Sequence, residues 1–245
     1  MSLQHETDER KLYDKNFYSS RHNETEYAAD RIIAILYQVF PQLQKVIDVG
    51  CGVGTFLRAA KKHGALQIKG LDGDWVHRSA LVIPESDFQS VNLKQLPLIG
   101  ENYNLTISLE VAEHLPKEMA APYINWLCKL SPIILFSAAV PGQGGIGHHN
   151  EKWQSYWANL FEQNGFLPCE VIRPEIWNDE KIHFWYKQNT ILYVKPVETP
   201  HSQSKPSPSL SLPLDIIHPQ LYLMKTNALS NRGILRRVIN RLLGS

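Results

Sequence analysis

The stretch that most constrains this chain is a run of β-branched residues that ends in three glycines at alternate positions. Residues 46–49 are followed by Gly50, Gly52 and Gly54, and a helical pattern begins directly after them. This order predicts a strand, a tight turn and the start of a helix. Glycines in such a turn supply unusual backbone angles and leave bare backbone beside helix N–H groups that have no internal partner. We therefore expect a ligand to bind at this turn.

The acids around the turn narrow the choice of ligand. The Gly-x-Gly-x-Gly spacing differs from the Gly-x-Gly-x-x-Gly of dinucleotide folds, and no Gly-Lys-Ser/Thr follows as in a P-loop. Asp48 stands on the strand before the first glycine. Asp72 ends the next expected strand, at a distance along the chain where an acid can bind ribose hydroxyls. The alternative is an ordinary strand-to-helix turn that binds nothing.

Size, charge and cysteine content exclude several classes of protein. The chain has 245 residues, enough for one α/β domain and an extension, and a net charge of +1 that selects neither nucleic acid nor an acidic partner. Its three cysteines are too few and too far apart for a disulfide framework or a structural zinc site. The absence of a long apolar run and the polar, acidic N-terminus predict a cytoplasmic protein.

The pattern of apolar residues predicts alternating helices and strands. We expect helices at residues 28–40, 55–63, 117–130 and 151–164, and strands at residues 46–49, 68–72, 88–93, 104–110, 132–140, 170–173 and 189–195. This alternation predicts an α/β fold with a doubly wound sheet.

The composition changes after residue 196. Residues 197–213 are rich in proline and serine, which predicts an extended linker. Residues 214–245 form a C-terminal tail in which apolar residues lie on one helical face and arginines elsewhere. A basic amphipathic helix of this kind can lie on an anionic membrane surface, dock to a protein partner or pack back on its own domain.

The segment Asp48-Val49-Gly50-Cys51-Gly52-Val53-Gly54 resembles motif I of the class I S-adenosylmethionine-dependent methyltransferases. The resemblance covers residues 10–196 or so. It implies a Rossmann-like, seven-stranded, mostly parallel sheet with helices on both faces, a methyltransferase domain at residues 1–196, and S-adenosylmethionine bound across the strand ends. The residues it assigns to the cofactor are Asp48, Gly50, Cys51, Gly52, Gly54, Asp72, Gly73, Trp75, Asn92, Leu93 and Glu110.

Several of these assignments leave alternatives open. By resemblance Asp72 binds the ribose, and Trp75 either stacks on the adenine or covers the edge of the sheet. The family often has Asp-Leu where this chain has Asn92-Leu93; the amide oxygen of Asn92 can still accept from the adenine amino group, and Asp87 is the substitute.

The segment that leads into the first helix carries the aromatic residues Tyr13, Phe17 and Tyr18. In the resembled family, an N-terminal helix packs beside the cofactor site. These aromatic side chains therefore form either a lid over the pocket or contacts to the core.

Acids and histidines gather where the strands at residues 104–110 and 132–140 end. Glu110, Glu113 and His114 follow the first strand, and the glycine-rich loop with His148 and His149 follows the second. Both loops open at the same edge of the sheet, where ligands bind in this architecture. We expect Glu113, His114, His148 and His149 to face the acceptor of the methyl group.

The same cluster has a second interpretation as a metal site. Glu110, Glu113, His114 and His148 together could hold Mg²⁺ or Mn²⁺. The arrangement resembles the Glu-x-x-Glu-His metal site of ubiquinone-pathway O-methyltransferases and of small-RNA 3′-end 2′-O-methyltransferases. Many small-molecule methyltransferases, however, carry a similar segment with no known metal.

A hydroxyl acceptor must lose a proton as it receives the methyl group, and a histidine is the usual base. His148 is the first candidate and His149 the second. The alternative for both is a solvated turn.

The predicted function is therefore S-adenosylmethionine-dependent O-methylation of a small molecule or glycan. The glycan preference comes from residues 138–157, which resemble bacterial methyltransferases found with glycan and natural-product pathways. One alternative acceptor is the 3′ end of an RNA, against which the near-neutral charge argues. An alternative function is that of a non-catalytic, cofactor-binding scaffold that recruits partners through its tail.

Overall fold

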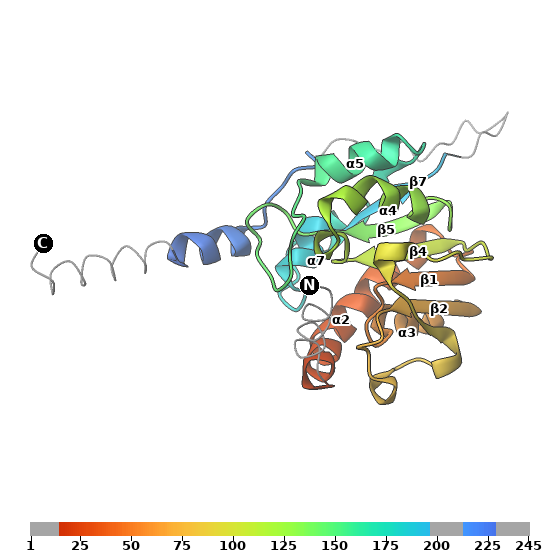
Figure 1. The fold of residues 1–245 in the computed structure, drawn as a ribbon. Coiled ribbons are helices and arrows are strands. Elements are labelled where there is room, and N and C mark those ends of the chain that lie inside the picture. Colours follow the sequence, from red (N-terminus) through yellow and green to blue (C-terminus); the bar gives the residue numbers. More distant parts are fainter. Residues whose placement is uncertain (1–14, 197–212, 229–245) are drawn as a thin grey trace, which may run out of the picture.

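The computed structural model describes residues 15–196 and 213–228, with side chains described from residue 25 onward. Its centre is a seven-stranded sheet in the order β3-β2-β1-β4-β5-β7-β6 (Figure 1). Only β7 runs antiparallel to its neighbours, so the predicted doubly wound, mostly parallel sheet is confirmed. The strands are β1 (Lys45–Val49), β2 (Gln67–Asp72), β3 (Phe88–Ser90), β4 (Leu105–Leu109), β5 (Ile133–Ser137), β6 (Leu167–Cys169) and β7 (Ile191–Val194).

Helices cover both faces of this sheet, because its central strands are apolar on both sides. On β1, Val46 packs into the core of one face, and Ile47 and Val49 pack into the core of the other. The first core includes side chains of α2, α3, α6 and α7, and the second includes those of α4 and α5. The helices are α2 (Lys15–Val39), α3 (Thr55–Lys62), α4 (Ala120–Leu127), α5 (Gln154–Glu162), α6 (Arg173–Ile176) and α7 (Phe184–Asn189).

The sheet changes direction between β1 and β4. From β1 the chain builds outward through β2 to β3, and it then returns to place β4 on the other side of β1. Open α/β sheets bind ligands at such a switch point, at the carboxyl ends of the strands. The glycine turn that follows β1 and Glu110, which follows β4, are therefore placed on either side of the natural binding crevice.

Several predicted boundaries were wrong. The strand expected at 170–173 lies instead at Leu167–Cys169, and Arg173 begins α6. Pro174 explains the change, because proline lacks the N–H that a strand needs and suits the first turn of a helix. The expected strand at 88–93 ends at Ser90. The helix 117–130 is shorter, since its first residues form a 3₁₀ turn before α4 begins at Ala120.

The C-terminal part of the chain returns to the domain. Residues 219–228 are helical and lie beside α7 (Figure 1). The segment before this helix is held by Arg173, whose guanidinium donates to the carbonyl oxygens of Pro213 and Leu214, and by Gln154, which donates to that of Ile216. For residues 213–228, packing back on the domain is thus observed. Residues 197–212 of the predicted linker and the basic part of the tail lie outside the described residues.

In the same segment, Asp215 caps a helix of the domain. Its carboxylate accepts the backbone N–H of Ser155 at 2.7 Å and the Ser155 hydroxyl at 2.7 Å, in the first turn of α5. A carboxylate at this position satisfies a helix N–H that has no internal partner and faces the positive end of the helix dipole. Within the described residues, no helix is long and apolar enough to cross a membrane.

We expect Asp215→Ala to destabilise the protein and to loosen residues 213–228. Loss of a helix cap costs about 1 kcal/mol, which lowers the unfolding temperature by about 2–4 °C in a chain of this size. Thermal unfolding and limited proteolysis measure the two effects. Glu162→Ala, at the exposed opposite end of α5, is the matched control. Unchanged unfolding and unchanged protection of the segment would show that the cap does not hold it.

Candidate functional site

A cavity of about 880 Å³ opens at the carboxyl ends of β1, β2 and β4. It collects residues that the sequence placed far apart. The predicted site residues that line it are Asp48, Gly50, Cys51, Gly52, Asp72, Gly73, Trp75, Asn92, Leu93, Glu110, Glu113, His114 and His148. Gly54 and His149 do not line it. Gly54 has φ 91° and precedes the first residue of α3, and His149 is exposed.

The glycine turn needs its glycines for two reasons. Gly50 has φ 82°, a left-handed conformation that a side chain strains. A Cβ atom on Gly50 would also lie 2.3 Å from Cγ2 of Val111, inside the chain that follows β4. The N–H of Gly50 donates to the carbonyl oxygen of Leu71 at 2.7 Å, which ties the turn to the end of β2. The turn therefore lines the cavity with backbone atoms that hydrogen bonds hold in place.

Asp72 joins this turn to the next one. Its two carboxylate oxygens accept the N–H of Gly52 at 2.7 Å and that of Gly73 at 2.6 Å. Burial raises the pKa of Asp72, and the hydrogen bonds from Gly52, Gly73 and Trp75 oppose the rise because they favour the charged form. Each oxygen keeps further acceptor capacity, so Asp72 can still bind ribose hydroxyls as predicted.

Asp48 lines the same cavity as Asp72 and is only 3% exposed. Burial raises the pKa of Asp48 well above its ordinary value, and the negative charge of Asp72 raises it further. Two neighbouring carboxyls favour a cationic ligand, because a positive charge would offset both their desolvation and their mutual repulsion. A sulfonium cofactor is such a ligand.

The residues expected around the adenine border the same cavity. Trp75 lies close over Gly73, where an added Cβ would approach the indole ring to 2.2 Å. Asn92 caps a short 3₁₀ turn, and its side-chain oxygen accepts the N–H of Lys94 at 3.0 Å. Thr25 of α2 also lines the cavity, so the N-terminal helix borders the site as the resemblance implied. Asp87 does not line the cavity.

Glu110 occupies a strained position at the end of β4. Its φ of 56° is left-handed, which costs about 1 kcal/mol or more and is typical of functional sites. Its carboxylate accepts hydrogen bonds from the side-chain amides of Gln143 at 3.0 Å and Asn189 at 3.1 Å. Asn189 also donates to the amide oxygen of Gln143 at 2.9 Å. These three side chains form a polar cluster in which Glu110 and Gln143 line the cavity and the buried Asn189 lies behind them.

Glu113, His114 and His148 come together as a possible metal site. One ligand atom from each lies within 4.8 Å of the others. Glu113 is fully buried; its Oε1 accepts the N–H of Ala139 at 3.2 Å, and among the described residues its Oε2 has no hydrogen-bond donor. Burial and the neighbouring Glu110 carboxyl raise the pKa of Glu113 well above its ordinary value. A buried carboxylate oxygen without a partner, next to two imidazoles, fits a divalent cation. Glu110 is not part of this trio, although the metal hypothesis included it.

His148 has an orienting partner that the sequence analysis did not identify. Its Nδ1 lies 2.9 Å from Oε1 of Glu151. Burial alone would raise the pKa of Glu151, but hydrogen bonds from His148 and from the N–H groups of Gly142 and Gly144 outweigh burial and lower it. An ionised Glu151 only accepts hydrogen bonds, so Nδ1 of His148 donates to it, and the neutral form of the ring has its lone pair on Nε2.

Further residues of the site were also missed. Phe184, Trp185 and Tyr186 of α7 line the cavity, as does Met224 of the C-terminal helix. The spacing of Glu151 three residues after His148 was a usable signal. No signal predicted Met224, because its contact joins distant parts of the chain. Of the proposed lid, Tyr13 lies outside the described residues, and Phe17 and Tyr18 lie on α2, where their side chains are not described.

Comparison with known proteins identifies this architecture. No family model and no curated protein matches the sequence. Among solved structures, the fold is similar to magnesium protoporphyrin IX methyltransferase of Synechocystis PCC 6803 with bound S-adenosylhomocysteine, at a TM-score of 0.54 and 20% identity over 71% of this chain and 84% of that one. It is also similar to an O-methyltransferase family protein of Burkholderia thailandensis, at a TM-score of 0.55 and 14% identity over 77% and 62%.

A third similar structure is human N-acetylserotonin methyltransferase in complex with S-adenosylmethionine. Its TM-score is 0.52, with 12% identity over 75% of this chain and 56% of that one. Identities this low establish the fold alone. The chain has the α/β fold of the class I methyltransferases, which confirms the resemblance first drawn from its glycine turn.

We expect Asp48→Asn to stabilise the ligand-free protein, and to do so more as pH rises. Because the pKa of Asp48 is raised in the folded state, the unfolded chain loses this proton at a lower pH than the folded protein does. The free energy of unfolding therefore falls as the pH rises above 3.8, the ordinary pKa of the group. The asparagine removes this cost. The difference in unfolding temperature between variant and wild type should therefore be larger at about pH 8 than at about pH 4.5. Glu162→Gln, an exposed acid, is the control, and a difference independent of pH would contradict the assignment.

Proposed function

We propose that this protein is an S-adenosylmethionine-dependent methyltransferase that methylates a hydroxyl group of a small molecule or glycan. One observation carries the proposal: a single cavity is lined by the glycine turn, by Asp72 and by His148, whose ring contacts Glu151 outside the lining. The part of the cavity around the glycine turn and Asp72 suits the nucleoside of the cofactor. The part around His148 suits an acceptor that must lose a proton.

In this proposal the cofactor supplies a methyl group already activated by its positive sulfur, so the protein mainly positions the acceptor. Glu110 and Gln143, which Asn189 holds in place from behind, offer polar groups for acceptor hydroxyls. When the acceptor hydroxyl receives the methyl group, Nε2 of His148 would take its proton. Glu151 fixes the orientation of the ring and stabilises its positive charge.

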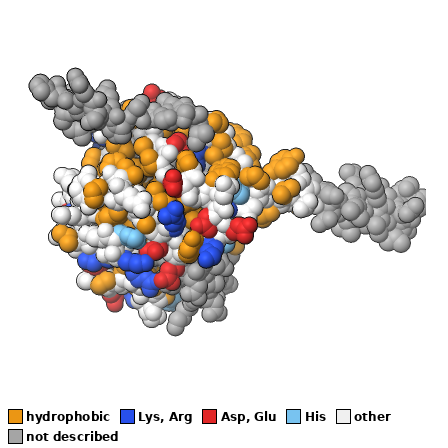
Figure 2. Space-filling model, turned by 180° about the vertical axis from the view of Figure 1, so that it is seen from behind, with side chains coloured by type: hydrophobic (Ala, Val, Ile, Leu, Met, Phe, Trp, Pro, Cys, Tyr) orange, Lys and Arg blue, Asp and Glu red, His pale blue; other side chains and the backbone are white. Residues whose placement is uncertain are grey.

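The charges of the site argue against an RNA acceptor. Five carboxyl side chains line the cavity, and Lys94 is the only lysine or arginine among its described lining residues. On the face seen in Figure 2, Lys and Arg are interspersed with Asp and Glu rather than gathered into one basic surface. Binding of a polyanion needs clustered positive charge. A non-catalytic scaffold, in turn, has no need of an oriented histidine at this place.

A divalent cation is a further possibility for the same site. Glu113, His114 and His148 would hold the ion, and a cation there lowers the pKa of a bound hydroxyl. An ion on Nε2 of His148 would remove that atom as a base. The two roles of His148 are therefore alternatives.

We expect His148→Ala to lower kcat for methyl transfer by about 10² to 10⁴-fold, the usual contribution of a positioned base. Glu151→Gln should lower it by about tenfold or more, because the ring loses its fixed tautomer. The assay follows a labelled methyl group into small-molecule, glycan, RNA and protein fractions of a cell extract. Binding of S-adenosylhomocysteine should be unchanged in both variants.

His149→Ala is the control, since its exposed side chain does not line the cavity. Label in the small-molecule or glycan fraction supports the proposal. Label in the RNA fraction would show that the acceptor is RNA and not a small molecule or glycan. Binding of S-adenosylhomocysteine with no transfer into any fraction would favour the scaffold.

The metal hypothesis predicts a shift in thermal stability. A cation at 100 times its Kd stabilises the folded state by about 2.7 kcal/mol, or roughly 5–10 °C for a chain of this size. We expect Mn²⁺ or Mg²⁺ to raise the unfolding temperature of the wild type and of His149→Ala. Glu113→Gln should abolish the shift. An unfolding temperature that no divalent cation changes would leave His148 as a base without metal.

A further inference from the structure

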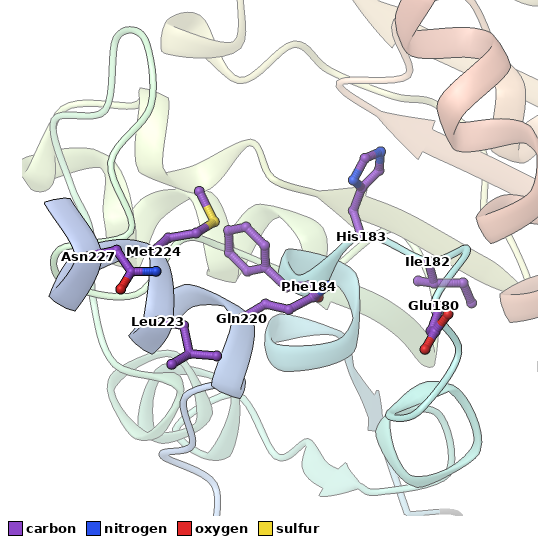
Figure 3. A pocket seen from close by; sticks show the side chains of 8 residues that line it. All are labelled: Glu180, Ile182, His183, Phe184, Gln220, Leu223, Met224 and Asn227. Atoms are coloured by element: carbon purple, nitrogen blue, oxygen red, sulfur yellow. The ribbon is translucent and has the colours of Figure 1, made fainter.

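A second cavity, of about 310 Å³, lies between the start of α7 and the C-terminal helix of residues 219–228 (Figure 3). Four apolar side chains line it: Ile182 and Phe184 from the domain, and Leu223 and Met224 from the C-terminal helix. In Figure 3 the side chains of Phe184 and Met224 point toward one another across the gap between these two elements. Nothing in the catalytic step described above uses this cavity.

The second cavity adjoins the catalytic one. Phe184 and Met224 line both of them, so the two spaces share a wall. A molecule whose hydroxyl lies at His148 can therefore extend past Phe184 and Met224 into the second cavity. The shared wall makes the smaller cavity a natural extension of the acceptor site.

The chemistry of the lining favours an uncharged, apolar group. Leu223 is 55% exposed and Met224 is 57% exposed, so a group placed over them would remove apolar surface from water. Glu180 is the one acid among the described lining residues, and none of them is lysine or arginine. A phosphate or carboxylate would find no lysine or arginine among these lining residues.

The C-terminal helix is held in place by contacts that connect it with the catalytic wall. The backbone N–H of His218 donates to the side-chain oxygen of Gln188 at 2.8 Å, and Gln188 donates to the side chain of Asn189 at 2.9 Å. Asn189 in turn donates to Glu110. Leu221 is buried against the domain. The helix that carries Met224 is therefore fixed to the domain, so Met224 has a defined position between the two cavities.

We propose that the second cavity is a subsite for an apolar extension of the acceptor. The acceptor is then amphipathic: its hydroxylated part lies in the catalytic cavity, and its alkyl or aryl part lies between Phe184 and Met224. This inference rests on the proposed function, since it names the class of molecule that the same site accepts. The helix of residues 219–228 acts as the specificity element for that extension.

The three methionines of the chain provide a direct test. They are Met1, Met119 and Met224, so a protein labelled with methyl-¹³C methionine gives few signals, and Met224→Leu assigns the one from the cavity. The probe is n-octyl β-glucoside below its micellar concentration, added to protein saturated with S-adenosylhomocysteine. We expect a saturable shift of the Met224 signal. Methyl β-glucoside should leave it unchanged, and Met119 should respond to neither compound.

Two substitutions on the C-terminal helix sharpen the test. Leu223→Asp should weaken the binding of octyl glucoside by about tenfold or more, because it places a charge in the apolar lining. Tyr222→Asp is the matched control: Tyr222 is 63% exposed on the same helix and lines neither cavity, so affinity should not change.

The subsite is overturned if the Met224 signal does not move, moves equally with methyl glucoside, or moves equally in Leu223→Asp. It is also overturned if only anionic phospholipid vesicles change the signal, because the face would then bind a bilayer. The readout needs no turnover. Calorimetric binding of S-adenosylhomocysteine tests the cofactor site separately, so failure of the subsite and failure of the proposed function are distinguishable.

Discussion

The site depends on one buried carboxylate, that of Asp72. It accepts the N–H groups of Gly52 and Gly73, and so fixes the turns that follow β1 and β2 relative to each other. A buried charge is costly unless hydrogen bonds compensate it, and here the backbone donors offset part of the cost of burying Asp72. The glycines are the other half of the arrangement, because Gly50 leaves the space that Val111 fills. Together these contacts hold open the crevice at the switch point of the sheet.

The acceptor side is organised by contacts between segments far apart in the chain. Glu151 gathers His148 and the N–H groups of Gly142 and Gly144, which turns a glycine-rich loop into a defined structure. Gln188 links the C-terminal helix with the polar cluster around Glu110. The strand-to-helix turns of the sheet supply the part of the cavity around Asp72, and these long-range contacts supply the part around His148.

The part of the cavity around the glycine turn was predictable from the sequence because local sequence patterns encode it. Continuous β-branched runs marked the central strands, and the glycine spacing marked the turn. The acceptor half was predicted only in part. Helix α7 was missed because its last residues, Lys187, Gln188 and Asn189, are polar yet buried, which hides the helical period. Met224 lines the cavity only because residues 213–228 pack back on the domain, and no local sequence pattern encodes that contact.

The measurement that tests the account most directly is calorimetric titration of the protein with S-adenosylhomocysteine. We predict one site per chain in the wild type, with affinity reduced by about tenfold or more in Asp72→Ala, because the ribose loses its acceptor and the two turns lose their link. Unfolding temperatures of both proteins must accompany the titration. Absence of binding to the folded wild type, or equal affinity in a folded Asp72→Ala variant, would contradict the assignment of this cavity to the cofactor.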